Sequence, residues 1–298
     1  MNLESRIMKF NQTPNSLPVF HHIAKNAGTY VLGWMLFLAT KYFGKNIDYC
    51  KVVKVILNGG KSLSFICCLH EEFNQEKYEF KVLSESALQT DQASFLELLT
   101  DGQIKIFSAS IDPFGDPGWF LEKEYLLKIK EFLGLDHLLN FMVLRNPYGR
   151  AQSLFNYIGS DDSSHEPSHK LYRSKNFIEF LSSGELEDCW IIRNLLDLNH
   201  NQPILSEHFF SCCNNYFQYF EVEDISNVDL LIDRVFFRVY GIDQNAGNKE
   251  KLKNIIGKNP STYHQKIAFE ELPEEAREAF LHRAYWDIKL HERYCKNV

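Results

Sequence analysis

Lysine, glycine and threonine stand close together in a short polar segment near the beginning of the chain, at Lys25, Gly28 and Thr29. An apolar segment of strand length, residues 17–23, precedes them, and an apolar stretch of helical length, residues 31–43, follows. This order predicts a strand, a tight turn and a helix. The first N–H groups of a helix have no partner within the helix and carry the positive end of its dipole. Together with the ammonium group of Lys25 and the hydroxyl group of Thr29, they would bind a phosphate group.

A second group of residues that could bind phosphate lies far downstream. The apolar residues 141–144, which predict a strand, run into Arg145. Pro147 suits the first turn of a helix, and this helix would carry Ser153 roughly two turns beyond Arg145. A guanidinium fork and a hydroxyl group can hold one phosphate group together. The first segment is not a Walker A loop, because its lysine precedes its glycine.

These two segments resemble the motifs of the sulfotransferases that use 3′-phosphoadenosine 5′-phosphosulfate (PAPS). Residues 21–29, HHIAKNAGT, are similar to the 5′-phosphosulfate loop of that family, which usually reads H-I-P-K-x-x-G-T. Residues 144–157, LRNPYGRAQSLFNY, are similar to its 3′-phosphate motif, L-R-[DN]-P-x-x-R-x-x-S. The likeness is greatest to the branch that includes carbohydrate sulfotransferases.

The resemblance implies an α/β fold, the P-loop-like three-layer sandwich with a central parallel sheet of about five strands. The alternation of strand-like and helical segments also predicts a parallel sheet with helices on both faces, and open sheets of this kind bind ligands at the carboxyl ends of their strands. We expect a single domain over residues 1–298, with a polar N-terminal extension at 1–16 and a surface loop at 160–174. Toward the C-terminus, the sequence predicts a strand at 216–222 and one final helix at 273–294.

The resemblance further implies a role for each matching residue. Lys25 would neutralise the charge that grows on the bridging oxygen as adenosine 3′,5′-bisphosphate leaves. The 5′-phosphate would be held by Asn26, Ala27, Gly28, Thr29 and Tyr30, and the 3′-phosphate by Arg145 and Ser153. Family members often close a C-terminal loop over the nucleotide, and Lys258 and Ser261 stand at the matching position. Because lysine and backbone dipoles carry the charge, the reaction is expected to need no metal ion.

The general base is the point at which the chain departs from the family. The histidine that usually serves as base would fall at Ile111, which is followed by Asp112. Asp112, His22 and His70 are therefore the candidate bases, and a chain without catalytic activity is the alternative. His70 stands at the end of an apolar strand beside two carboxylates that would raise its pKa. It also fits an ordinary exposed histidine at the start of a loop.

Composition excludes some classes of protein. The net charge of −7 argues against a nucleic-acid-binding protein, whose phosphate contacts require a basic face. It does not exclude an anionic cofactor, because local lysines and arginines set the field there. The seven cysteines form no CxxC pair and no zinc-binding spacing. They are expected to be reduced, mostly buried thiols of a cytosolic protein.

Nothing in the sequence predicts a membrane span or a secretory signal. Residues 1–16 are polar, and the longest apolar run, residues 30–39, is too short to cross a bilayer. Golgi members of the resembled family carry an N-terminal anchor that this chain lacks. We therefore expect a soluble, cytoplasmic and bacterial enzyme.

Two rivals to a sulfotransferase remain open at this point. One is a P-loop-type kinase or hydrolase that uses ATP and Mg²⁺. The other is a relative that retains the nucleotide site, has lost the base and serves only as a binding protein. Carbohydrate is favoured as the acceptor only by analogy with the family, and a lipid, a peptide tyrosine or a natural-product hydroxyl group stays open as an alternative.

Overall fold

The computed structural model describes residues 15–23, 26–45, 47–71, 73, 80–111, 118–160, 176–183, 189–196, 198–199, 202–242 and 267–295. The expected N-terminal extension lies outside these residues except for its last two, and Ser16 already belongs to a strand. The expected surface loop at 160–174 also lies outside them, apart from Ser160, the last residue of a helix.

The described residues form two compact units. The first consists of the described parts of 1–22, 29–142 and 228–256. The second consists of the described parts of 23–28, 143–227 and 257–298. A single domain over the whole chain stays a prediction.

The chain is an α/β protein, as expected, and its described strands form one mixed sheet in the order β4-β5-β2-β3-β6-β1-β7-β8. These strands are β1 (Ser16–His21), β2 (Cys50–Ile56), β3 (Ser62–Leu69), β4 (Lys81–Ser84), β5 (Ala87–Asp91), β6 (Ile104–Ile111), β7 (His137–Leu144) and β8 (Glu221–Asp224). Strand β1 is parallel to both β6 and β7, and β2 is parallel to β5. The pairs β2–β3, β3–β6 and β4–β5 are antiparallel.

The mixed sheet of eight strands differs from the parallel sheet of about five strands that the sequence led us to expect. The reason is a hairpin between β2 and β3. Gly59 and Gly60 adopt positive φ angles of 92° and 81°, which glycine reaches without steric strain. A tight turn of this kind reverses the chain, so β3 returns beside β2 in the antiparallel direction.

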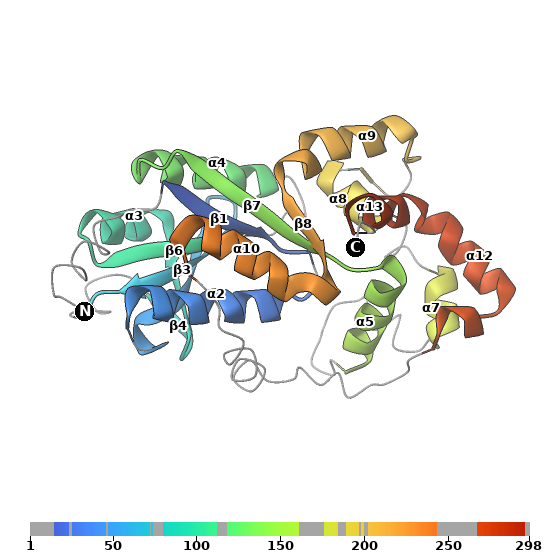
Figure 1. The fold of residues 1–298 in the computed structure, drawn as a ribbon, viewed down its shortest axis with the longest axis horizontal. Coiled ribbons are helices and arrows are strands. Elements are labelled where there is room, and N and C mark those ends of the chain that lie inside the picture. The colour runs from blue at the N-terminus through green and yellow to red at the C-terminus, as the bar shows by residue number, and fades with distance from the viewer. Residues whose placement is uncertain are drawn as a thin grey trace. The chain divides into compact units, whose positions relative to one another are not determined.

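Helices cover both faces of the sheet in the first unit. Helices α2 (Gly28–Phe43) and α10 (Val228–Tyr240) lie on one side of the strands, and α3 (Gln92–Thr100) and α4 (Gly118–Phe132) lie on the other (Figure 1). On the side of α10, Phe236 packs on Phe107 and Phe141, with ring centroids 5.3 Å and 6.1 Å apart. On the side of α3, Phe65 stacks on Phe95 with ring centroids 4.8 Å apart. The buried aromatic side chains thus fix each helical layer on the sheet.

A bulge in the sheet directs Phe107 toward α10. Ile66 pairs with Ser108 and Cys67 with Ile106, so Phe107 is the extra residue in β6. A bulge turns a side chain away from the face that strict alternation would give it. Phe107 is fully buried, and the hydroxyl group of Tyr240 donates a hydrogen bond to its carbonyl oxygen.

The second unit is mostly helical. Its α-helices are α5 (Pro147–Ser160), α7 (Phe177–Ser183), α8 (Trp190–Leu196), α9 (Ser206–Asn215), α12 (Glu274–Arg283) and α13 (Tyr285–Cys295). Four short 3₁₀ turns are also described in the chain, η1 (Ile47–Tyr49), η3 (Phe217–Tyr219), η4 (Ile225–Asn227) and η5 (Phe269–Glu271). Buried side chains from α5, α7 and α12 form one hydrophobic core, which includes Phe155, Phe180 and Phe280. Asp287 of α13 is almost fully buried and accepts hydrogen bonds from the N–H groups of Ile191 and Ile192 in the first turn of α8.

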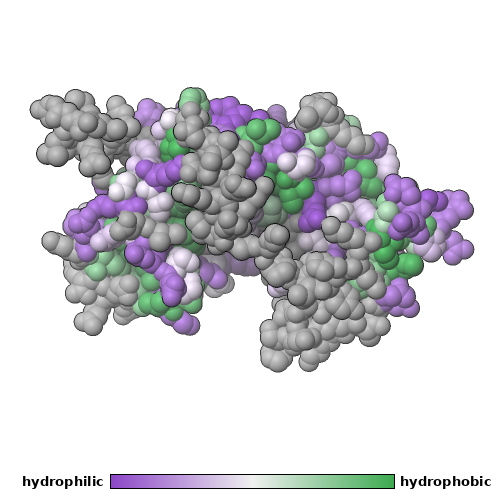
Figure 2. Space-filling model, turned by 60° about the horizontal axis from the view of Figure 1, so that its bottom comes forward, coloured by the Kyte–Doolittle hydropathy of each residue, from purple (hydrophilic) through white to green (hydrophobic). Residues whose placement is uncertain are grey.

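Two expectations for the C-terminal half are wrong in detail. Residues 216–222 are not one strand, because they contain η3 and only the beginning of β8. The final helix expected at 273–294 is two helices, which meet at Ala284. Among the described helices, none is both long and apolar enough to cross a bilayer. Figure 2 shows hydrophilic and hydrophobic residues side by side on the described parts of one face.

Candidate functional site

Three parallel strands of the first unit end at the same edge of the sheet. His21, the last residue of β1, is in register with Ile111 of β6 on one side and with Met142 of β7 on the other. The carboxyl ends of parallel strands are where open α/β sheets bind their ligands. Asp112, the residue after β6, lies outside the described part of the chain.

The expected phosphate-binding turn is held by Asn26, which is fully buried. Its backbone N–H group donates a hydrogen bond to the carbonyl oxygen of Ile23 at 3.1 Å. Its side-chain nitrogen Nδ2 donates to the carbonyl oxygen of Val143 at 3.0 Å. Val143 lies in β7, two residues before Arg145. The second unit therefore brings together the two segments that the sequence analysis had linked only by resemblance.

The backbone of the turn is unusual at Ala27, which has a φ angle of 63°. The left-handed conformation is unfavourable for an L-residue with a side chain, and such outliers gather at functional sites. Helix α2 starts at the next residue, Gly28, and its first turn contains no acidic residue. The positive end of its dipole is therefore not neutralised within that turn. Thr29 is exposed, so its hydroxyl group is accessible.

Tyr30 was expected to help hold the 5′-phosphate, but its side chain is bonded to another helix. Its hydroxyl group donates a hydrogen bond to Asp229 Oδ1 of α10 at 2.5 Å. Burial, together with this hydrogen bond, raises the pKa of Tyr30 to about 12. The phenol is thus protonated at neutral pH and bound to α10, which leaves only the backbone N–H group of Tyr30 for a phosphate.

Arg145 is partly buried, directly after β7, and Ser153 lies on α5, also partly exposed. Burial lowers the pKa of Arg145, and the carboxylate of Asp224 at the end of β8 opposes that effect. Gly149 lies close to the guanidinium group, because a Cβ atom there would meet Arg145 Nε at 3.2 Å. That distance is tight for a carbon contact, so Gly149 leaves room for the Arg145 side chain. The sequence analysis gave no role to Gly149 or to Asp224.

The two histidines named as bases lie at opposite edges of the sheet. The backbone N–H group of His22 donates a hydrogen bond to the carbonyl oxygen of Ile111, the last residue of β6, at 2.9 Å. The backbone N–H group of His70 donates a hydrogen bond to the carbonyl oxygen of Gln103, the residue before β6, at 2.8 Å. Gln103 and Ile111 are eight positions apart along the strand, or about 26 Å. His70 is therefore not beside His22, because β3 runs antiparallel to β6.

Three other residues named from the sequence lie outside the described part of the chain. They are Lys25, which precedes Asn26, and the pair Lys258 and Ser261. Their roles stay predictions.

Comparisons of the chain with models of known protein families, with curated proteins and with solved structures give no match. The fold and the site define an α/β protein with a mixed sheet, in which a turn at a helix N-terminus is hydrogen-bonded to the strand that leads into Arg145.

Proposed function

We propose that this protein is a PAPS-dependent sulfotransferase with a P-loop-like α/β fold, which transfers a sulfuryl group to a hydroxyl group of its acceptor. The observation that carries the proposal is the hydrogen bond from Asn26 to Val143. It joins the two segments whose sequences resemble the 5′-phosphosulfate loop and the 3′-phosphate motif. These segments are far apart in the chain, so their association in one unit supports the resemblance.

In the proposed complex, the two ends of the nucleotide are bound by different groups. The N–H groups at the start of α2, the hydroxyl group of Thr29 and the ammonium group of Lys25 hold the 5′-phosphosulfate. Arg145 and Ser153 hold the 3′-phosphate, which distinguishes PAPS from ATP. The contact between Gly149 and Arg145 supports this role, because it keeps space for the guanidinium group in the first turn of α5.

The reaction forms a bond between the acceptor oxygen and sulfur while the bond from sulfur to the 5′-phosphate oxygen breaks. The electron pair of the broken bond goes to the phosphate, and Lys25 stabilises that charge. The proton of the acceptor hydroxyl group goes to a base. His22 and Asp112 are the candidates that follow strands ending at the same edge of the sheet. A carbohydrate is the proposed acceptor, by analogy with the resembled branch.

One observation favours a second candidate function, a nucleotide-binding protein without catalytic activity. Ile111, at the position of the usual catalytic histidine, is only 1% exposed and belongs to the hydrophobic core. If neither His22 nor Asp112 replaces that histidine, the protein would bind the nucleotide without transferring the sulfuryl group.

The test is turnover of PAPS with a panel of mono- and oligosaccharides, with release of adenosine 3′,5′-bisphosphate measured by chromatography. The wild-type protein should release the bisphosphate only when a suitable acceptor is present. Lys25→Ala should abolish release without unfolding the protein, whereas Lys81→Ala, an exposed lysine on β4, should have no effect. Wild-type turnover in Lys25→Ala would overturn the assigned role. Tight binding of the bisphosphate without turnover would favour the second candidate.

A further inference from the structure

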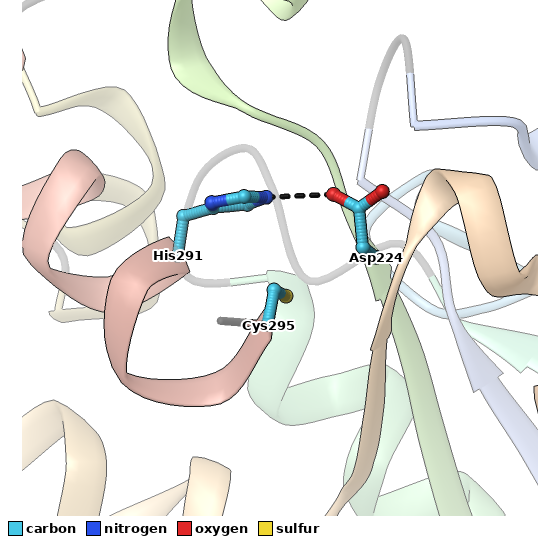
Figure 3. Close-up of side chains that lie close together, drawn as sticks. All are labelled: Asp224, His291 and Cys295. Atoms are coloured by element: carbon cyan, nitrogen blue, oxygen red, sulfur yellow. Dashed lines mark hydrogen bonds and ion pairs between the residues drawn. The ribbon is translucent and has the colours of Figure 1, made fainter. Parts of the chain in front are cut away.

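Three side chains of the types that bind transition metals meet in the second unit. Asp224 comes from the end of β8, and His291 and Cys295 come from α13 (Figure 3). The carboxylate oxygen, the imidazole nitrogen and the sulfur atom all lie within 4.8 Å of one another. His291 Nε2 donates a hydrogen bond to Asp224 Oδ2 at 2.7 Å. The two groups point toward each other, and Cys295 lies beside them.

Local structure explains why these side chains converge. His291 and Cys295 are four residues apart on α13, so they lie on the same face of the helix. Helix α13 packs against β8, which places Asp224 opposite that face. The N–H and hydroxyl groups of Ser226 both donate hydrogen bonds to Asp224 Oδ1, at 2.8 Å and 2.6 Å. Oδ1 is thereby fixed, and Oδ2 faces His291.

Burial and charge also suit a cation. The side chains of His291 and Asp224 are 12% and 19% exposed, and Cys295 is 8% exposed. Burial and the carboxylates of Asp224 and Glu223 raise the pKa of the Cys295 thiol to about 12. The same two carboxylates attract a cation to the sulfur. The guanidinium group of Arg145, near Asp224, repels a cation, but the two carboxylates outweigh this one positive charge.

We infer that Asp224, His291 and Cys295 form a binding site for a divalent transition metal ion of the zinc type. Sulfur, nitrogen and oxygen ligands in one set are typical of zinc, and three protein ligands leave a fourth position for water. Tetrahedral bonds of about 2.0–2.3 Å place the ligand atoms roughly 3.3–3.8 Å apart. The His291 and Asp224 ligand atoms, now 2.7 Å apart, would therefore separate by roughly 0.6–0.8 Å. The inference does not depend on the proposed sulfotransferase activity.

Binding has a defined proton balance. The metal ion replaces the proton of the Cys295 thiol, which is released to solvent. The proton that Nε2 donates to Asp224 leaves that nitrogen, and His291 binds through Nε2 as a neutral imidazole whose one proton is on Nδ1. Asp224 Oδ2 exchanges its hydrogen bond from His291 for a bond to the metal, while Oδ1 keeps its two bonds from Ser226.

The test uses Co²⁺ as a spectroscopic substitute for Zn²⁺ on the metal-free, reduced full-length protein. One equivalent of Co²⁺ should produce the near-ultraviolet charge-transfer band of a cobalt–thiolate bond, and Zn²⁺ should remove the band. Cys295→Ser should abolish the band. His291→Gln and Asp224→Asn should weaken Zn²⁺ binding by more than the roughly 10- to 100-fold that is typical for loss of an outer-shell partner.

The matched control is Cys68→Ser, which changes a buried cysteine that faces Cys50 across β2 and β3. This variant should keep the cobalt–thiolate band. A band that survives in Cys295→Ser, or that is lost in Cys68→Ser, would overturn the assignment, as would failure of the wild-type protein to bind either ion. If Cys295→Ser does not fold, the affinities of His291→Gln and Asp224→Asn decide the question.

Discussion

Asn26 Nδ2 donates a hydrogen bond to the carbonyl oxygen of Val143 at 3.0 Å, across 117 positions of the sequence. This bond attaches the turn before α2 to the strand that leads into Arg145. Asn26 is fully buried, and its partner Val143 is only 1% exposed. The proposed nucleotide site depends on this hydrogen bond between Asn26 and Val143.

Asn26→Ala should destabilise the protein by about 1–3 kcal/mol, because the buried carbonyl group of Val143 loses its donor. Urea unfolding measures this change in the free energy of unfolding. Asn215→Ala is the control, since that exposed side chain on α9 bonds to Ser211 on the same helix. The control should stay within about 0.5 kcal/mol of the wild type. Equal stability of Asn26→Ala and the control would show that the turn is not held as described.

Gly149→Ala should separate stability from nucleotide binding. Alanine favours a helix by up to about 1 kcal/mol over glycine, so the variant should be at least as stable as the wild type. The added Cβ would meet Arg145 Nε at 3.2 Å and shift the guanidinium group. We expect roughly three- to tenfold weaker binding of adenosine 3′,5′-bisphosphate, measured by calorimetry, with AMP binding unchanged. Equal weakening for both nucleotides would count against a role of Arg145 at the 3′-phosphate.

His21 should make the protein less stable in mild acid. Burial lowers the pKa of His21 to about 4. A hydrogen bond to Asn140 at 2.9 Å acts in the opposite direction but is the weaker effect. The unfolded chain takes up a proton below about pH 6.5 and the folded chain only below about 4, so stability falls as the pH drops through that window. The loss from this group is on the order of 3 kcal/mol.

Urea unfolding between pH 7 and pH 4 tests this expectation. His21→Gln, which does not titrate, should lose less stability over the window than the wild type. His70→Gln, at an exposed histidine, should behave as the wild type does. The same pH dependence in wild type and His21→Gln would contradict the assignment.

Much of the secondary structure followed from local sequence patterns. The apolar run before His70 predicted β3, the apolar stretch at 31–43 predicted α2, and Pro147 marked the start of α5. These signals are strong because they depend on burial and on backbone chemistry within a few residues. The break at Ala284 left no signal, because its φ and ψ angles of −84° and 7° lie in the bridge region, which is open to ordinary residues and needs neither glycine nor proline.

Strand direction and long-range neighbours could not be predicted in this way. The pattern of an apolar strand does not show its direction, so His70 was predicted to lie near the phosphate-binding turn. In the structure β3 pairs with β6 in the antiparallel direction, and His70 therefore lies at the opposite edge of the sheet. Asn26 and Arg145 were found because each lies in a local motif. The position of Asp224 beside His291 depends on packing between β8 and α13, which no local pattern describes.

The most direct test of the proposed function is calorimetric binding of adenosine 3′,5′-bisphosphate, AMP and ATP with Mg²⁺ to the wild type, Arg145→Ala and the exposed-site control Arg293→Ala. The wild type and the control should bind the bisphosphate more tightly than AMP or ATP. Arg145→Ala should lose roughly 10- to 100-fold in bisphosphate affinity, the value of a charge-assisted contact, and little in AMP affinity. Equal binding of bisphosphate and AMP by the wild type would contradict a PAPS site, and binding of ATP only with Mg²⁺ would point to a kinase instead.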